Sequence, residues 1–276
     1  MIILDGRKLA EKLLEDIRKE AAEFGKKPRL AAVVVGDDPV VRKFVAQKKK
    51  AAESAGIEVR VYEFESAITT NDLRRRLVEI VHEKKNDGVI IQLPLPSQVN
   101  TQYILNAVTP EKDVDVLSAR SLGNFVVGKS PVMPPVAGAI KAIFEEYGIQ
   151  YAGRRIVIAG AGALVGRPVA LWLLNAGATL SIIRSSTPSP EEFLRAADII
   201  ISGMGEPRFI TGDMLKEGVI IIDAGTSESE GKIAGDIDFE SATPKASYIT
   251  PVPGGVGPVT VVMLLKNVVI LARARS

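Results

Sequence analysis

Short aliphatic runs alternate with amphipathic stretches along most of the chain. In the first part, LAAVVVG (30–36), IEVRVYEF (57–64) and DGVIIQLPLP (87–96) are typical of strands, whereas TNDLRRRLVEIVHEK (70–84) has helical spacing. Later, RIVIAG, ATLSIIRS, DIIISG and GVIIIDAG are predicted strands with helices between them. This alternation predicts an α/β fold with parallel sheets.

The length of the chain and one irregular segment predict two domains. A chain of 276 residues exceeds the usual size of one compact domain. Residues 118–136 are rich in Gly, Ser and Pro and are interpreted as the crossing between domains. We expect one α/β domain over 1–119 and a second over 137–252. A final helix over 259–276 is expected to fold back onto the first domain.

One predicted helix directs a lysine toward its apolar side. In DDPVVRKFVAQKKKAAESAG, Asp38 suits the N-cap and Pro39 the first helical position. At about 100° per residue, Lys48 falls in the middle of the apolar stripe, whereas Lys50 points to water. The stripe consists of Val41, Phe44, Val45, Ala52 and Ala55. A lysine run is ordinarily a solvated helix face, but an inward lysine either extends its amine to solvent or keeps it in a low-dielectric site. There its pKa falls and it can transfer protons near neutrality.

Composition excludes several classes of partner and site. Thirty-five basic against 33 acidic residues leave a net charge of +2, too balanced to indicate a nucleic-acid or membrane partner. With no cysteine and His82 as the only histidine, we expect no metal site and no Ser-His-Asp catalysis. The N-terminus lacks a signal-peptide core, and the apolar run 259–272 is short and contains Lys266. A soluble, cytoplasmic protein is expected.

A glycine-rich turn predicts a Rossmann-type dinucleotide-binding domain. RIVIAGAGALVGRPVALWLLNAGATLSIIRSS reads as strand, turn, helix and strand. Gly160 and Gly162 permit a tight turn and a close approach to phosphate, and Gly166 lets the helix pack against the sheet. The G-x-G-x-x-x-G spacing is one residue longer than the usual fingerprint, so a purely structural turn is the alternative.

The end of the next strand favours NADP over NAD. An NAD site usually places an acid there to bind the ribose hydroxyls, but the strand ends IIRSST. Arg184, Ser185 and Ser186 would suit a 2′-phosphate through charge-assisted hydrogen bonds. The alternative is that Arg184 is an ordinary surface residue.

Three further sequence segments contain polar residues, or combinations of proline and glycine, that ordinary packing does not require. Gln92 ends the aliphatic run in IIQLPLP, Asp113 and Asp115 lie in KDVDV, and TPVPGGVGPVT combines prolines with glycines. Gln92 or Asp115 alone could be a turn cap. Beside a dinucleotide domain, the three pieces together favour a ligand cleft between the domains.

With these pieces the chain resembles the bifunctional methylenetetrahydrofolate dehydrogenase/cyclohydrolases. GDDP, VIIQLPLP, PEKDVD, GAGALVGRP, GDIDF and YITPVPGGVGPVTVVML occur in the order of that family, and the last is highly specific. The resemblance implies an N-terminal α/β catalytic domain, a Rossmann-type NAD(P)-binding domain and a C-terminal helix that returns to the first. It also implies a homodimer formed through the cofactor domains.

The resemblance implies two consecutive reactions on tetrahydrofolate, the one-carbon carrier. A hydride leaves the methylene bridge of 5,10-methylenetetrahydrofolate for NADP, and water then opens the methenyl product to 10-formyltetrahydrofolate. Lys48 would be the catalytic lysine of the hydrolysis, Gln92 the amide that positions it, and Asp115 the carboxylate that binds the pterin. Folate-binding residues would be Phe44, Pro253, Gly254 and Gly255. Cofactor-binding residues would be Gly160, Ala161, Gly162, Val165, Gly166, Arg184, Ser185 and Thr226.

The sequence departs from the family pattern at several positions. Phe44 stands where the family usually has tyrosine, one helical turn before Lys48, so a hydroxyl is absent. The turn reads GAG instead of GRS, and Arg184 replaces a histidine. No glycine follows Asp115, and VMPPVAG replaces the usual PCTPxG.

These departures leave alternatives open. Without the tyrosine hydroxyl, we expect hydride transfer to survive better than hydrolysis, and a dehydrogenase without cyclohydrolase activity is the nearest alternative. A non-catalytic NADP-binding regulator would be expected to lack the lysine, glutamine and aspartate, which are all present. A shikimate-type dehydrogenase gives no reason for PVPGGVGP.

Overall fold

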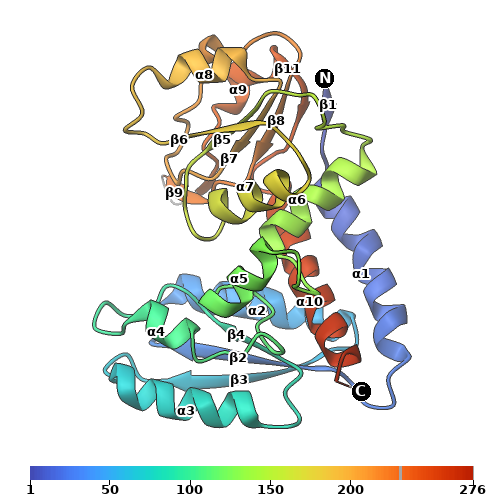
Figure 1. The fold of residues 1–276 in the computed structure, drawn as a ribbon, viewed down its shortest axis with the longest axis vertical. Coiled ribbons are helices and arrows are strands. Elements are labelled where there is room, and N and C mark those ends of the chain that lie inside the picture. Colours follow the sequence, from blue (N-terminus) through green and yellow to red (C-terminus); the bar gives the residue numbers. More distant parts are fainter. Residues whose placement is uncertain (230–231, 276) are drawn as a thin grey trace. The chain divides into compact units, whose positions relative to one another are not determined.

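The structure, a computed structural model, describes residues 1–229 and 232–275. The chain forms two compact units. One comprises Met1–Ala10 and Val136–Thr260 and is called the six-stranded unit; the other comprises Glu11–Pro135 and Val261–Ser276 and is called the three-stranded unit. Figure 1 shows the strands and helices of each.

The three-stranded unit is a parallel sheet in the order β3-β2-β4. Its strands are β2 (Arg29–Val35), β3 (Glu58–Phe64) and β4 (Gly88–Ile91). Its helices are α2 (Pro39–Ser54), α3 (Thr70–His82), α4 (Thr101–Leu105) and α5 (Ala119–Val126), with most of α1 (Gly6–Ala22) and α10 (Val256–Arg273). On one sheet face, Ala31 and Val33 pack against Leu77 of α3 and Ile104 of α4.

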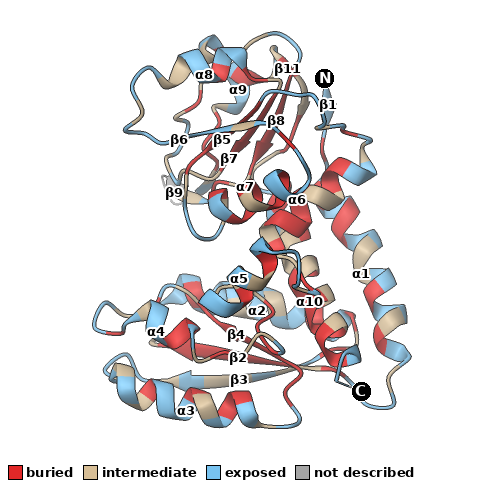
Figure 2. Cartoon of the chain, viewed as in Figure 1, coloured by how far each residue is buried: buried red, intermediate tan, exposed pale blue. Residues whose placement is uncertain are grey.

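The alternate residues of β2 are buried as well, so both faces of the sheet are covered. Leu30, Ala32 and Val34 are each at most 5% exposed. A strand buried on both faces has a continuous aliphatic sequence, which is why LAAVVVG shows no polar alternation. Edge strand β3 alternates between exposed and partly buried residues, as Figure 2 shows.

The six-stranded unit is a parallel sheet in the order β1-β11-β8-β7-β5-β6. Its strands are β1 (Ile2–Ile3), β5 (Ile156–Ala159), β6 (Leu180–Ile183), β7 (Ile199–Ser202), β8 (Val219–Asp223) and β11 (Ala246–Ile249). Its helices are α7 (Gly166–Asn175), α8 (Pro190–Ala196), the 3₁₀ turn η1 (Gly212–Met214), α9 (Phe239–Ala242) and most of α6 (Pro135–Glu146). β9 (Ser227–Ser229) and β10 (Lys232–Ala234) form an antiparallel pair.

The predicted α/β class with parallel sheets is confirmed. Central strands β5, β7 and β8 are buried throughout (Figure 2). DGVIIQLPLP was expected to form a strand that ends in a loop fixed by prolines. The strand β4 ends at Ile91, and the prolines, which cannot donate ladder hydrogen bonds, follow it.

Two segments lie differently from the sequence expectation. Residues 118–136, expected as an irregular crossing, contain α5, whose N-cap Ser118 accepts a hydrogen bond from the Ser121 N–H.

The N-terminus joins the six-stranded unit, although 1–119 was expected to form the first domain: β1 pairs with β11 and Leu4 N–H donates to the Ile249 carbonyl at 2.8 Å. A two-residue strand has no periodicity by which a sequence pattern could identify it.

The last helix lies slightly earlier in the sequence than its pattern indicated, over Val256–Arg273 instead of 259–276. α10 begins at Val256, three residues before the expected start at 259. Its 18 residues have a mean hydropathy of 1.7, and among the described residues it is the one helix long and apolar enough to cross a membrane. Because 61% of it is buried in the protein, its apolar sequence is that of a core helix.

Candidate active site

Lys48 lies on the partly buried side of α2. Asp38 caps this helix by accepting hydrogen bonds from the Val40 and Val41 N–H groups, and Pro39 occupies its first turn, as predicted. The Lys48 side chain is half-buried, whereas Lys49 and Lys50 are exposed. The helical periodicity therefore identified the one lysine of the three that points inward.

Gln92 accepts the hydrogen bond that the Lys48 amine donates. The distance from Lys48 Nζ to Gln92 Oε1 is 2.7 Å. Gln92 follows β4 directly, is 8% exposed, and its backbone N–H continues the ladder to the Val33 carbonyl at 2.9 Å. Its Nε2 donates to the Leu93 carbonyl at 3.0 Å, which turns the amide oxygen toward the amine. A neutral amine donating one N–H here keeps its lone pair free to accept a proton.

Lys48 and Asp115 influence each other electrostatically, and burial shifts both. Burial lowers the pKa of the Lys48 amine, and the Asp115 charge opposes that shift. Burial raises the pKa of Asp115 to about 6, which the Lys48 charge opposes and Asp113 reinforces. An amine and a carboxyl whose pKa values move toward neutrality from opposite sides can exchange protons with a bound molecule near physiological pH.

Asp113, the other acid of KDVDV, braces the loop. Its carboxylate accepts hydrogen bonds from the backbone N–H groups of Ser118 at 2.9 Å and Leu117 at 3.4 Å. In contrast, no hydrogen bond to the Asp115 carboxylate occurs among residues 1–229 and 232–275. The two acids therefore differ in role: Asp113 shapes the loop, and Asp115 keeps acceptor oxygens available for a ligand.

Phe44 lies one helical turn before Lys48 and is more exposed than its position in the apolar stripe predicts. It is 40% exposed, whereas Val41 and Ala52 of the same stripe are 5% and 0% exposed. A ring with an accessible face next to a polar site can stack on a flat ligand.

The glycine-rich turn connects β5 to α7 in the six-stranded unit. Gly160 has φ +99, and a Cβ there would lie 2.4 Å from the Gly203 carbonyl oxygen. A Cβ on Gly166 would lie 2.0 Å from the Gly160 carbonyl oxygen, whereas Gly162 has open space around it. Gly160 and Gly166 are thus required by the fold, and Gly162 leaves room for an approaching group.

The N-terminus of α7 is available to an anion. Its N-cap is Val165, which makes no side-chain hydrogen bond to the first turn. Ala161 is held by Arg167, whose Nε donates to the Ala161 carbonyl at 3.1 Å. In the first turn, the Arg167 N–H donates to the Gly162 carbonyl at 3.0 Å and Pro168 has no N–H. The helix dipole and the Gly166 N–H are therefore what this end of α7 offers to a phosphate.

The other predicted cofactor residues follow strands of the same sheet. Arg184 and Ser185 follow β6 and are exposed, and the Arg184 N–H donates to Thr187 Oγ1 at 2.9 Å. Thr226 is exposed in the loop after β8. Parallel strands present their carboxyl ends at one edge of a sheet, where α/β proteins bind ligands.

Pro253, Gly254 and Gly255 lie between β11 and α10 in the six-stranded unit. The Gly254 φ is +116, and a Cβ on Gly255 would lie 2.6 Å from the Pro251 carbonyl oxygen. This segment therefore requires its glycines for conformation. The structure brings Lys48, Gln92 and Asp115 together in the three-stranded unit, and these three glycine-loop residues belong to the other unit.

Sequence analysis missed two buried acids that shape the loops around Thr226. Asp223, at the end of β8, accepts hydrogen bonds from the N–H groups of Gly225 (2.9 Å) and Ile237 (3.0 Å), and burial raises its pKa to about 7. Asp236 accepts from Ser202 Oγ and the Met204 N–H, both at 2.7 Å. The available signal was an acid at the end of an aliphatic run, in IIIDAG, and the acids of GDIDF.

Lys112 is a further buried lysine, which sequence analysis did not single out. Its surroundings indicate a structural role. It is 6% exposed, and its Nζ donates to the carbonyls of Val81 and Glu83 near the end of α3. Burial lowers its pKa to about 8. An amine engaged by helix-terminal carbonyls fixes its loop rather than serving a ligand.

The chain matches two models of one protein family. Residues 4–115 match the tetrahydrofolate dehydrogenase/cyclohydrolase catalytic domain, and residues 134–276 match the NAD(P)-binding domain of the same family.

Relatives of known name cover the whole chain. The bifunctional protein FolD of Nautilia profundicola is 44% identical over 278 residues, covering 99% of this chain and 98% of that protein. The crystal structure of the bifunctional FolD methylenetetrahydrofolate dehydrogenase/cyclohydrolase from Campylobacter jejuni has a TM-score of 0.97 at 39% identity and covers 100% of both chains. The corresponding Trypanosoma brucei enzyme, complexed with NADP cofactor and inhibitor, has a TM-score of 0.95 at 32% identity and covers 100% of this chain and 98% of that one.

Replacing Lys48 by Met should raise the pKa of Asp115 above its value of about 6, because the positive charge that stabilises the carboxylate is removed. A ¹³C NMR titration of the Asp115 carboxyl carbon measures this. Lys49→Met, which removes an exposed lysine from the same helix, is the control and should leave the midpoint where it is. An unchanged midpoint in Lys48→Met would contradict the coupling between the two groups.

Proposed function

Because the chain belongs to the tetrahydrofolate dehydrogenase/cyclohydrolase family, we propose that it oxidises 5,10-methylenetetrahydrofolate with NADP⁺ and hydrolyses the 5,10-methenyltetrahydrofolate formed to 10-formyltetrahydrofolate. The observation that carries this proposal is the 2.7 Å hydrogen bond from Lys48 Nζ to Gln92 Oε1, made by an amine whose pKa burial lowers. The proposed enzyme is cytoplasmic, and neither reaction calls for a metal ion.

In the first reaction the protein binds and orients. Bound NADP⁺ would supply the acceptor for the hydride of the methylene carbon, which would leave a cation shared between N5 and N10 of the folate. Holding two reactants in the right geometry can supply most of the acceleration of such a step. Phe44 would stack on the pterin with its accessible ring, and Pro253, Gly254 and Gly255 would line the folate pocket.

In the second reaction the Lys48 amine acts as general base. Water adds to the methenyl carbon as its proton passes to the neutral amine, giving a hydroxylated ring. The bond from this carbon to N5 then breaks as the hydroxyl oxygen loses its proton and N5 gains one, and the carbon remains on N10 as a formyl group. Gln92 holds the amine by its amide oxygen, and burial keeps part of the lysine population neutral.

Asp115 would bind the pterin through hydrogen bonds from the ring N–H groups. Its carboxylate has no hydrogen bond within the described residues, and burial gives any hydrogen bond made there greater strength than in water. Its charge also opposes the lowering of the Lys48 pKa.

The cofactor site is proposed at the turn between β5 and α7. Gly160, Ala161, Gly162, Val165 and Gly166 would surround the pyrophosphate, with the uncapped helix N-terminus behind it. Arg184 and Ser185 would bind the 2′-phosphate of NADP, and Thr226 would contact the cofactor from the loop after β8. No acid stands directly after β6, in RSST, to bind the ribose hydroxyls of NAD.

The alternative of a dehydrogenase without cyclohydrolase activity is not favoured. The lysine and glutamine proposed for hydrolysis are both present and in contact. Relatives at about 40% identity over the whole chain are named bifunctional. A non-catalytic regulator would not require a buried amine, an amide and a carboxyl in one place.

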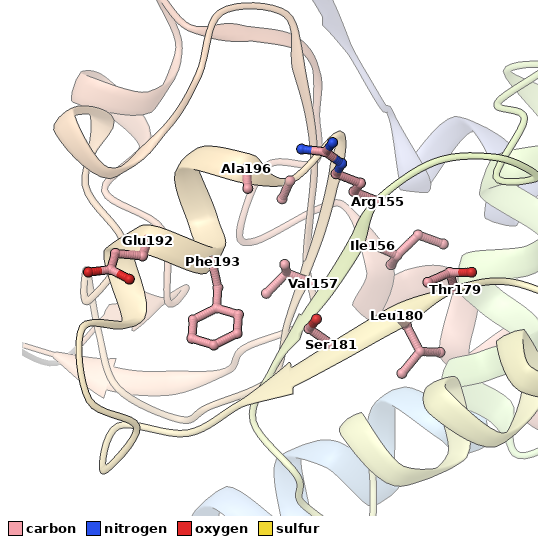
Figure 3. Close-up of a pocket in the computed structure, with 10 residues that line it drawn as sticks. Arg155, Ile156, Val157, Thr179, Leu180, Ser181, Glu192, Phe193 and Ala196 are labelled. Carbon is pink, nitrogen blue, oxygen red and sulfur yellow. The ribbon is translucent and has the colours of Figure 1, made fainter.

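We further propose that the protein is a homodimer formed through the six-stranded unit. β6 is the last strand of its sheet, and its outer edge has no strand partner in the described chain. Ile182 is 47% exposed and Phe193 of α8 is 40% exposed. Arg155, Val157, Leu180 and Phe193 line a pocket of about 320 Å³ beside this strand, as Figure 3 shows. An exposed, apolar edge strand is a site at which proteins associate.

The unmodified protein should convert methylenetetrahydrofolate to 10-formyltetrahydrofolate, with kcat/KM at least about tenfold higher for NADP⁺ than for NAD⁺. NADPH formation and methenyltetrahydrofolate loss are to be followed separately. A ratio near one would contradict the NADP preference, and accumulation of methenyltetrahydrofolate at its uncatalysed rate of decay would contradict the bifunctional assignment.

Lys48→Met should lower the hydrolysis rate by at least about 100-fold, because the general base is removed, while hydride transfer falls by roughly tenfold or less. Lys49→Met is the matched control and should retain both rates. Hydrolysis at the unmodified rate in Lys48→Met would show that another group takes the proton.

Phe44→Tyr should raise the hydrolysis rate about tenfold, since a hydroxyl one turn before Lys48 can hydrogen-bond to the amine or to the attacking water. The dehydrogenase rate, which relies on orientation, should change less. Equal hydrolysis in the two proteins would mean that water already fills this role beside Phe44.

Ile182→Lys should convert the dimer to a monomer, because it places like charges together in the proposed interface. Light scattering gives the mass in solution. Ile233→Lys changes an isoleucine of similar exposure, 43%, in β10 of the same unit and should leave the dimer intact. A monomeric unmodified protein would contradict the proposed assembly.

A further inference from the structure

Asn267 is a buried polar residue of the largely apolar helix α10. It is 2% exposed, and both of its hydrogen bonds go to backbone carbonyls of the three-stranded unit. Its Nδ2 donates to the Val114 carbonyl at 2.8 Å and to the Met133 carbonyl at 2.7 Å. An amide nitrogen carries two hydrogens, so these two bonds use its full donor capacity.

The bond to Val114 acts on Asp115 through the peptide plane. The Val114 carbonyl and the Asp115 N–H belong to the same planar group, so anchoring the oxygen fixes the direction in which the Asp115 backbone continues. The second hydrogen bond, to the Met133 carbonyl, ties the loop that contains Asp115 to the segment 131–135 through Asn267. Asn267 therefore connects two pieces of irregular backbone to a regular helix.

The backbone on the other side of Asp115 is strained. Val116 has φ +57 and is 1% exposed. A β-branched residue in the left-handed region is a marked outlier and persists where surrounding contacts impose it. The expected glycine is absent from this position, so the loop adopts a conformation against the preference of its own sequence.

Val114 is also held by its side chain. A Cβ on Gly88 would lie 2.4 Å from Val114 Cγ1 and 3.4 Å from Val268 Cγ2, so the absence of a side chain at Gly88 lets Val114 pack against β4. The Asp113 carboxylate fixes the following turn through the Ser118 N–H. Asp115 thus lies between an anchored residue and a strained one, with its own carboxylate unused by the fold.

We propose that Asn267 is a positioning residue for folate binding, which sets the orientation of Asp115 through the Val114 carbonyl. The proposal rests on the proposed function, in which Asp115 binds the pterin. In this role Asn267 does not touch the substrate. Its hydrogen bond to the Val114 carbonyl opposes relaxation of the strained backbone at Val116.

Asn267→Ala should lower kcat/KM for methylenetetrahydrofolate by roughly 10- to 100-fold, mainly through a higher folate KM, with the KM for NADP⁺ within about twofold. Asn267→Ser keeps one donor, removes fewer atoms and should give an intermediate value, so the result does not depend on recovering the alanine variant. Asn86→Ala is the matched control. Asn86 is also fully buried in this unit, where its Nδ2 donates to the Ile80 carbonyl and Tyr62 Oη, and its loss should leave the folate KM unchanged.

A double-mutant cycle separates positioning from general destabilisation. If Asn267 acts through Asp115, Asn267→Ala should change the folate KM by less than about twofold in an Asp115→Asn background. Fully additive effects, or a folate KM equal to that of the unmodified protein in folded Asn267→Ala, would overturn the proposal.

A measurement without substrate distinguishes this proposal from the proposed function. Amide hydrogen exchange over residues 113–118 should accelerate at least about tenfold in Asn267→Ala and remain unchanged in Asn86→Ala. If the unmodified protein does not turn over methylenetetrahydrofolate, the proposed function fails, and faster exchange still supports the loop constraint. Unchanged exchange in Asn267→Ala overturns the positioning role even when the unmodified enzyme is active.

Discussion

The candidate site depends on an amine that is kept partly out of water by the helix that carries it. Lys48 has one polar anchor, the Gln92 oxygen at 2.7 Å, and burial lowers its pKa. Desolvation lowers the pKa of the amine, and the nearby Asp115 charge opposes that shift. The balance of these two effects, rather than either one, sets how much neutral and how much protonated lysine is present.

This balance is maintained by backbone that is fixed from several directions. Gln92 continues the ladder of β2 through its N–H before its side chain turns toward Lys48. Asp113 closes the loop that precedes α5, and Asn267 anchors the carbonyl before Asp115. A strained Val116 in the same loop indicates that the position of Asp115 is imposed by these contacts and not chosen by local preference. The precision of the site is therefore a property of the whole three-stranded unit.

The parts of this arrangement that could be predicted are those that depend on local periodicity or on glycine. Asp38, Pro39 and the inward direction of Lys48 follow from helix geometry, and the turn of Gly160 follows from strand-turn-helix spacing. Contacts between residues distant in the sequence had no such signal. Nothing near Asn267 indicates that its amide reaches Val114, 153 positions earlier, and the two-residue strand β1 is too short to show a pattern. The exposure of Phe44 could not be predicted either. Helical periodicity gives the direction of a side chain but not how closely other parts of the protein pack against it.

One buried lysine can serve both proposed reactions because both disfavour a positive charge at the same place. Hydride loss creates a cation on the folate, which a protonated amine nearby would oppose, and hydrolysis of that cation needs a neutral amine to take the proton from water. In the proposed mechanism, lowering the pKa of Lys48 would therefore assist both the formation and the consumption of the intermediate. A hydroxyl beside the amine would affect only the second of these steps, since it orients the amine or the water and does not change the charge. Phe44, which lacks that hydroxyl, would thus alter the ratio of the two proposed rates, while the electrostatic requirement that links them would stay the same.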